Sequence, residues 1–420
     1  MADTPLAILA DRLIDGTGRQ PVEAAVLVVA DGRIAAVGPR SSVRIPEGAQ
    51  VVDGDDLTLL PGFIDSHVHL AGQSGVDFNR LLMTRRSMLL LMSVPNTAAT
   101  LQAGVTSVRD AGLSPASVRD AIDAGYFPGP RCLMAVSILS QSGGHGDSTM
   151  PCGCALHMDC GMDVPDAVVD GPDMMRRRVR EVLFAGADWI KLCTSGGVLS
   201  PNDHPDAAQF TVDEIAVAVE EAASQGKRVM SHAMSAAGIK NALRAGVTSI
   251  EHGCLLDEEA IALMKERDAW LVPTLVAPRD VVAAASQGRS IPEAMVEKAR
   301  DISVRHMESF RAAVAAGVNI AMGTDSGVGP HGGNLRELAL MVEGGMSALD
   351  AITASTRAPA RLLRREHEIG TLEVGKLADA VALRGDPLSD IALLADADRI
   401  RLVLKGGERV KDLETAARPA

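Results

Sequence analysis

Short apolar runs separated by turn signals mark both ends of the chain. Residues 25–30 are apolar, Asp31-Gly32 is a turn signal and a second apolar run occupies 34–37, so this pattern predicts a β-hairpin. Similar strand and turn patterns fill residues 376–412. Neither segment is long enough to bury a good core alone. We therefore predict that the two termini meet in one small β-sandwich domain, made of residues 1–58 and 366–420.

The middle of the chain alternates strand patterns with helix patterns. Thr211 and Glu214 form a capping box that predicts the start of a helix, and Gly226 ends that helix. Strand patterns occur at 59–66, 105–109, 131–138, 188–193, 228–232, 247–252, 270–275 and 318–325. This alternation over residues 59–365 predicts an α/β fold of the (β/α)8 TIM barrel type, with an open doubly wound sheet as the alternative.

Composition and charge exclude several classes of protein. Of the 420 residues, 47% are hydrophobic and 23% are charged, so the chain can form a large core and is not predominantly disordered. A net charge of −13 and an aromatic content of 2% disfavour binding to nucleic acid or to anionic lipid. We expect no membrane span and no secretory signal. Six cysteines do not make a disulfide framework in a chain of this length, so a cytoplasmic location is expected.

Histidines stand at the ends of several predicted barrel strands. His67 and His69 are two residues apart, so their side chains point to the same face of a strand and could share one metal ion. His232, His252 and Asp325 each end a further strand pattern. In a barrel these strand ends gather at one face, so the set predicts a divalent metal site. For each of these residues taken singly, an ordinary role in the core is about as good an interpretation as a role in binding metal.

Lys191 lies near the end of the apolar strand pattern at 188–193. A buried, unpaired ammonium is costly, so this lysine must be either paired or neutral. A neutral amine beside two cations could take up carbon dioxide and become a carbamate whose oxygens bridge two metals. On physical grounds alone, an ion pair with a nearby carboxylate is the simpler interpretation.

A set of motifs runs through nearly the whole chain. They are P-G-F-I-D-S-H-V-H at 61–69, S-G-G-H-G-D at 142–147, I-K-L-C-T-S-G-G-V at 190–198, S-H-A at 231–233, I-E-H-G at 250–253, G-T-D-S-G at 323–327 and G-K-L-A-D-A at 375–380. With these motifs the chain resembles the amidohydrolase superfamily. Within it, the chain is most similar to the imidazolonepropionase-related branch of metal-dependent Xaa-Pro dipeptidases and carboxypeptidases.

The resemblance implies a binuclear metal centre. The residues that would hold the two ions are His67, His69 and Asp325 for one, and His232 and His252 for the other. Lys191, as N6-carboxylysine, would bridge the ions, with a hydroxide between them. Zinc is the first expectation, and manganese or cobalt also suit histidine and carboxylate ligands. Asp325 would act as general base and then carry the proton to the leaving amine.

Two further positions concern the scissile carbonyl group. His145 matches a family histidine that polarises this carbonyl, and its flanking glycines favour that role over a bond to Asp147 alone. Peptidase relatives usually place a tyrosine that binds the oxyanion where this chain has Met234, whose thioether cannot donate a hydrogen bond. Losing one such donor typically costs about 3 kcal/mol. Either the substrate is more reactive than a peptide, or another donor substitutes, or the pocket is reshaped.

Weaker signals have competing structural interpretations. Arg109 could bind a substrate carboxylate, although a contact with Asp110 explains it equally well. His331 could line the pocket or lie on the surface of a glycine-rich loop. A cluster with C-x-C-x-x-H-x-x-C spacing fits no common zinc site, so we interpret it as a loop with reduced thiols. Its members are Cys152, Cys154, His157 and Cys160.

Two substrate classes fit this chemistry. The first hypothesis is a hydrolase that cleaves C–N amide bonds of dipeptides or N-acyl amino acids. The second is the same chemistry on a xenobiotic amide, carbamate or phenylurea, such as an aromatic amide toxin or a herbicide, and Met234 slightly favours it. A deaminase would need a glutamate shortly after His232, and 233–240 contains none. A metal-free scaffold would have lost ligands that are present here. The resemblance also implies a homo-oligomer.

Overall fold

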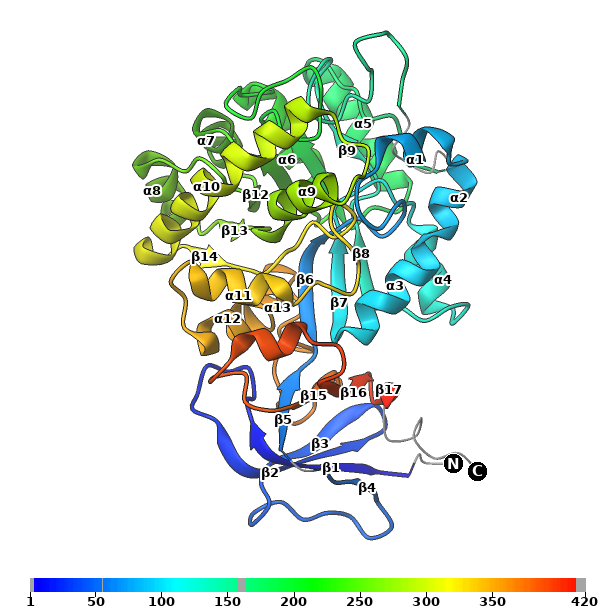
Figure 1. Cartoon of the computed structure of the whole chain (residues 1–420), viewed down its shortest axis with the longest axis vertical. Coiled ribbons are helices and arrows are strands. Elements are labelled where there is room, and N and C mark those ends of the chain that lie inside the picture. The colour runs from blue at the N-terminus through cyan, green and yellow to red at the C-terminus, as the bar shows by residue number, and fades with distance from the viewer. Residues whose placement is uncertain (1–3, 55, 157–162, 413–420) are drawn as a thin grey trace.

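The computed structural model describes residues 4–54, 56–156 and 163–412, so His157 and Cys160 of the cysteine-containing loop lie outside the described residues. Figure 1 shows a region of parallel strands surrounded by helices, and next to it a sheet that contains segments from both ends of the chain. Among the described helices, none combines the length and the apolar character needed to cross a membrane.

The sheet near the termini has eight strands, in the order β17-β16-β15-β5-β1-β2-β3 with β4 paired to β1. These strands are β1 Leu6–Leu13, β2 Val22–Ala30, β3 Arg33–Pro39, β4 Gln50–Val52, β5 Leu57–Pro61, β15 Ala380–Arg384, β16 Ile400–Lys405 and β17 Glu408–Asp412. β2 and β3 form the predicted hairpin, in which Asp31 and Gly32 both have positive φ angles, as a tight two-residue turn requires. β5 pairs with β1 on one side and with β15 on the other, and so joins the two ends of the chain.

The parallel strands form two sheets, ordered β6-β7-β8 and β14-β13-β12-β11-β10-β9. The strands are β6 Phe63–Val68, β7 Val105–Asp110, β8 Arg131–Met134, β9 Ile138–Leu139, β10 Trp189–Cys193, β11 Arg228–Ala233, β12 Ser249–His252, β13 Trp270–Val272 and β14 Asn319–Ile320. The predicted strand at 131–138 is divided into β8 and β9, because Val136 adopts a positive φ of 64° that interrupts the ladder.

The last predicted strand is also shorter than expected. Only Asn319–Ile320 is a regular strand, and Asp325, at the end of the predicted strand 318–325, has a positive φ of 60°. The segment after β14 nevertheless bonds to β6. The amide of Ser66 donates to the carbonyl of Met322 at 2.9 Å, and that of Asp325 donates to the carbonyl of His67 at 2.7 Å. The fold is therefore a TIM-barrel-like α/β fold, and Asp325 is held beside β6.

Helices lie around the parallel strands (Figure 1). They are α1 Phe78–Met83, α2 Arg86–Leu91, α3 Ser93–Gln102, α4 Ser117–Asp123, α5 Pro172–Phe184, α6 Val212–Ser224, α7 Ala236–Ala245, α8 Glu258–Glu266, α9 Val276–Ser286, α10 Glu293–Ala316, α11 Arg336–Glu343, α12 Ala348–Ala354, α13 Arg357–Leu362 and the 3-10 helix η1 Ile391–Ala395. On β10, Ile190 and Leu192 belong to the large core that the helices share. Trp189, at alternate spacing, packs instead against the guanidinium group of Arg109.

The capping box at the start of α6 is confirmed, with Thr211 and Glu214 each bonding the backbone of the other. Replacing Thr211 with Ala should lower the free energy of unfolding by about 1 kcal/mol, because one amide of the first helical turn loses its acceptor. Urea unfolding would measure this change. Thr211→Ser is the matched control and should retain most of the stability. Equal urea midpoints for wild type and Thr211→Ala would contradict the prediction.

Candidate active site

A cavity of about 660 Å³ opens at the carboxyl ends of the parallel strands. Its lining includes most of the predicted site residues: His67, His69, His145, Lys191, His232, Met234, His252 and Asp325. A second hollow, of about 1080 Å³, lies between α4 and α5 and is lined by charged side chains of both signs. It contains none of the predicted site residues, so the chemistry belongs to the first cavity.

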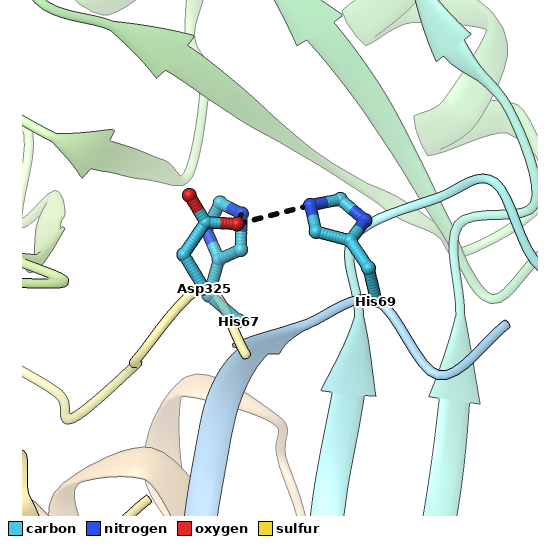
Figure 2. Close-up of side chains that lie close together, drawn as sticks. All are labelled: His67, His69 and Asp325. Carbon is cyan, nitrogen blue, oxygen red and sulfur yellow. Dashed lines mark ion pairs between the residues drawn. The ribbon is translucent and has the colours of Figure 1, made fainter. Parts of the chain in front are cut away.

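His67, His69 and Asp325 form one compact group (Figure 2). Oδ1 of Asp325 lies 3.1 Å from Nε2 of His69 and 3.5 Å from Nε2 of His67. The Nδ1 atoms point elsewhere: that of His67 lies 2.8 Å from Oε2 of Glu251, and that of His69 lies 3.0 Å from the carbonyl oxygen of Gly112. Because these oxygens can only accept, we assign the protons to Nδ1, which leaves the Nε2 lone pairs directed at Asp325.

The electrostatics of this group favour a cation. Burial would lower the pKa of His69, but the negative charge of Asp325 outweighs burial and raises it. Burial lowers the pKa of His67 to about 4, helped by the charge of Lys191. Burial would raise the pKa of Asp325, but the interactions with His67, His69 and Lys191 outweigh burial and hold this pKa well below its usual range. An anionic carboxylate that faces two imidazole nitrogens is a donor set suited to a divalent ion.

His232 and His252 lie beside this group on β11 and β12. Their ring centroids are 4.6 Å apart, and that of His252 is 5.1 Å from His67. Nε2 of His232 lies 3.1 Å from the carbonyl oxygen of Gly196, so Nε2 carries the proton. Nδ1 therefore keeps its lone pair, which can bind a metal ion. Burial and neighbouring positive groups hold the pKa of both histidines well below the usual value. Both rings are therefore neutral, which is the form that binds metal.

Lys191 lies on β10, in the cavity beside these histidines, with 2% of its surface exposed. Within the described part of the chain, its Nζ has no hydrogen-bond partner, so the simple hydrogen-bonded ion pair is not what the structure shows. Burial lowers the pKa of the amine. Such an amine is suited to carry a carbamate that binds two cations, and the residues around Lys191 therefore fit a binuclear centre.

The expected role of Arg109 in substrate binding needs correction. Arg109 is 0% exposed and does not line the cavity, because its guanidinium group is fully engaged inside the fold. It donates to the carbonyl oxygen of Ser66 at 2.7 Å, to Ser249 at 3.0 Å and to Oε1 of Glu251 at 2.8 Å. Burial alone would raise the pKa of Glu251, but the charge of Arg109 and the hydrogen bond from His67 outweigh it and bring it to about 2.

His331 also supports the site from behind instead of lining it. It is buried, and its Nε2 lies 3.1 Å from the carbonyl oxygen of His69 while its Nδ1 lies 3.1 Å from the hydroxyl of Thr100. These contacts fix the backbone that carries His69. The expectation that His331 contacts substrate is therefore corrected, because both ring nitrogens are occupied by the protein.

His145 reaches the cavity from the loop after β9 and stacks on His232 with a centroid distance of 4.1 Å. Its Nδ1 lies 2.7 Å from the hydroxyl of Ser200, which in turn bonds Asp203. Asp147, which the sequence offered as another partner for His145, instead accepts hydrogen bonds from backbone amides of its own loop. A side chain at Gly197 would place its Cβ 2.2 Å from the His145 ring, so only glycine leaves room for this histidine.

Met234 lines the cavity at the end of β11, and its backbone amide donates to the hydroxyl of Ser195 at 2.7 Å. Tyr126, the single tyrosine of the sequence, is largely exposed and does not line the cavity. Sequence reasoning did not assign roles to Glu251, Ser200 or Asp203. The I-E-H-G motif contains Glu251, but only its contacts with distant strands show what it does.

Comparisons with known proteins agree with this site. The sequence pattern of the amidohydrolase family matches residues 58–410. An ochratoxinase from Aspergillus niger is 35% identical over 424 residues, covering 96% of this chain and 86% of that protein. The solved structure of a Xaa-Pro dipeptidase with bound methionine has a TM-score of 0.88 and 35% identity, covering 97% of this chain and 99% of that one. A prolidase complexed with N-methylphosphonate-L-proline has a TM-score of 0.88 and 34% identity, covering 97% and 100%.

The chain belongs to the amidohydrolase family, which confirms the resemblance inferred from its motifs. It is a hydrolase of C–N bonds with a metal-binding fold of the TIM-barrel type.

Replacing Glu251 with Gln should weaken the metal site and the fold together. The amide cannot balance the charge of Arg109, and breaking a buried pair costs about 3 kcal/mol or more. It also removes an acceptor that orients His67, so metal affinity should fall by about 10- to 100-fold. Chelator competition measures the affinity, and urea unfolding of metal-free protein measures the stability. The exposed Glu266→Gln is the control. Unchanged metal affinity would contradict the role given to Glu251.

Proposed function

We propose that this protein is a binuclear metal-dependent amidohydrolase that cleaves C–N amide bonds of dipeptides or N-acyl amino acids. One observation carries the proposal: several imidazoles, a carboxylate and a lysine amine without a hydrogen-bond partner among the described residues line one cavity. The similarity to a Xaa-Pro dipeptidase and to a prolidase in complex with a proline-containing phosphonate supports the substrate class.

The proposed metal ligands are those that the resemblance implies. They are His67, His69 and Asp325 for one ion, and His232 and His252 for the other, with carboxylated Lys191 between them. Zinc is the first expectation, with manganese or cobalt as alternatives. Bound divalent ions would lower the pKa of water towards neutrality and polarise the scissile carbonyl group.

The residues of the chain would move the protons. Asp325 is anionic and faces the cavity, so its carboxylate can accept a proton from the attacking water and pass it to the leaving nitrogen. His145 would donate from Nε2 to the carbonyl oxygen as negative charge develops there. Burial lowers the pKa of His145, and the negative charge of Asp203, 3.8 Å from Nδ1, opposes this effect only in part.

The proposal extends to the architecture that carries the site. We infer a closed eight-stranded barrel over residues 59–365, because the segment after β14 bonds to β6. Residues 1–58 and 366–420 would form the separate β-sandwich domain. A homo-oligomer and a cytoplasmic location remain part of the proposal.

A second candidate function keeps the chemistry and changes the substrate to a xenobiotic amide, carbamate or phenylurea. Two observations favour it. Met234 offers no hydrogen-bond donor from its side chain at the cavity wall, so a substrate with a better leaving group needs less help with the oxyanion. The relative of 35% identity is named for its action on ochratoxin.

Purified protein should contain about two divalent ions per chain, as a binuclear centre requires. Turnover of dipeptides or N-acyl amino acids would support the first candidate, and turnover of aryl amides, carbamates or phenylureas alone would support the second. Removing the metals with a chelator should abolish either activity, and adding metal with bicarbonate should restore it. Absence of metal and of turnover after this reconstitution would overturn both candidates.

Replacing His145 with Ala should lower kcat by about 10²- to 10³-fold, the typical loss for one oxyanion donor, without changing the metal content. The exposed His367→Ala provides a matched control and should behave as wild type. Steady-state kinetics on the preferred substrate, together with metal analysis of each variant, test this. A His145→Ala variant within a few-fold of wild-type kcat would exclude the proposed role.

A further inference from the structure

Two cysteines, Cys152 and Cys154, flank one glycine in a tight turn at the surface, and both are exposed. Gly153 has a positive φ of 85°, a backbone conformation that glycine adopts without strain. Its amide donates to the carbonyl oxygen of Met150 at 2.8 Å, and the amide of Met150 donates to the carbonyl oxygen of Cys154 at 2.9 Å. These bonds hold the turn closed and keep the two cysteines together.

The two thiols are hydrogen-bonded to each other, and their surroundings give them different acidities. The pKa of Cys152 is lowered by hydrogen bonds from the backbone amide and from the thiol of Cys154. The pKa of Cys154 is raised, because its thiol bonds to Cys152 and would lose its proton beside a negatively charged sulfur. A thiolate is the nucleophilic form of cysteine, so Cys152 is the more reactive of the pair and Cys154 is a second thiol within its reach.

The spacing of this pair also suits a disulfide bond. Residues two apart in a chain have Cα atoms separated by about 5–7 Å, and disulfides span Cα separations of about 4.4–6.8 Å. By contrast, the other cysteines of the described residues, Cys132, Cys193 and Cys254, are buried, and burial raises the pKa of each. An accessible thiol with a lowered pKa beside a second cysteine is the usual arrangement of a redox-sensitive site.

The turn also borders the cavity that contains the candidate metal ligands. Its ends are joined by an antiparallel bridge between Thr149 and Ala155. Residues on both sides of the cysteines line the cavity: Thr149, Met150, Ala155 and Leu156. Leu156 packs in an apolar cluster with Phe78, which lines the cavity as well. A covalent link between the two cysteines would therefore restrain a segment of the cavity wall.

We propose that Cys152 and Cys154 are a redox-modification site whose reversible disulfide alters substrate binding by restraining the cavity wall. The co-reactant is a small-molecule disulfide such as glutathione disulfide. The Cys152 thiolate attacks one of its sulfurs, forms a mixed disulfide and releases the first thiolate. Cys154 then gives its proton to solvent, attacks the sulfur of Cys152 and releases the second thiolate. Each released thiolate takes up a proton from solvent, so the two cysteines are oxidised and the co-reactant is reduced to two thiols.

Mass spectrometry tests the oxidation on the whole protein treated with glutathione disulfide. Free thiols are then blocked with N-ethylmaleimide, and the chain is digested with chymotrypsin. Fragment 140–156, which ends in leucine, contains only these two cysteines. It should carry no maleimide and be two hydrogen atoms lighter than the dithiol form, and an excess of reduced glutathione should restore the dithiol. Maleimide on both cysteines at every ratio of oxidised to reduced glutathione would overturn the proposal.

Single variants test the roles within the pair. In Cys154→Ser, Cys152 should keep glutathione as a stable mixed disulfide, because no second thiol displaces it. Cys152→Ser should react with glutathione disulfide about threefold or more slowly than Cys154→Ser, since a thiol whose pKa is not lowered is less ionised at neutral pH. Cys160→Ser is the matched control and should still form the disulfide. Equal rates, or a disulfide between fragment 140–156 and Cys160, would contradict the assigned pair.

Steady-state kinetics test the effect on the cavity. Between the reduced and the oxidised protein, KM for the preferred substrate should differ by about threefold or more and kcat by less than about twofold, because the restrained wall would contact substrate away from the reacting bond. The double variant with Cys152→Ser and Cys154→Ser should show no difference between the two treatments. Equal KM values would overturn the effect on substrate binding. The mass measurement needs no turnover, so a failure of the proposed hydrolase function leaves the disulfide test unaffected.

Discussion

The ion pair between Arg109 and Glu251 is the interaction on which the site depends. Both side chains are fully buried, so each charge would cost several kcal/mol without the other. Arg109 comes from β7 and Glu251 from β12, and the pair also bonds the backbone of β6 through Ser66. The second oxygen of Glu251 holds the ring of His67. One buried pair therefore connects three strands and fixes the side chain at the centre of the metal-binding group.

The other histidines of the cavity are held in the same way as His67. The protein bonds one nitrogen of each ring and leaves the other nitrogen for a ligand. Gly112 accepts from His69, and Gly196 accepts from His232. Nδ1 of His252 lies 2.7 Å from the hydroxyl of Thr274. A ring held in this way loses little further freedom when a cation binds, so the affinity of the site comes from a geometry that folding has already produced. The hydrogen bonds that order these strands and loops therefore also orient the histidine rings for binding.

Local patterns in the sequence were enough to predict most helices and strands, but they could not predict contacts between distant segments. Alternation predicted that His67 and His69 point the same way, and both do meet Asp325 although β6 ends at Val68. The capping box located the start of α6. Both signals act over a few residues. The division at Val136 and the short β14 depend on backbone angles that residue type does not determine. The partners of Arg109 and His331 come from distant segments, and no local pattern indicates which of them will meet. The same holds for Gly197, whose need for a small residue arises only from the position of the His145 ring.

The pairing of β5 with both β1 and β15 has a consequence for synthesis of the chain. Thr58 on β5 donates to the carbonyl oxygen of Gly385, 327 positions later. At about 5–20 residues per second, a ribosome needs roughly 16 to 65 s to make that intervening length. Throughout this interval the edge of β5 that later receives β15 has no partner strand, and unpaired edges are sites of aggregation. Nascent chains would therefore carry this open edge while the barrel residues are still emerging.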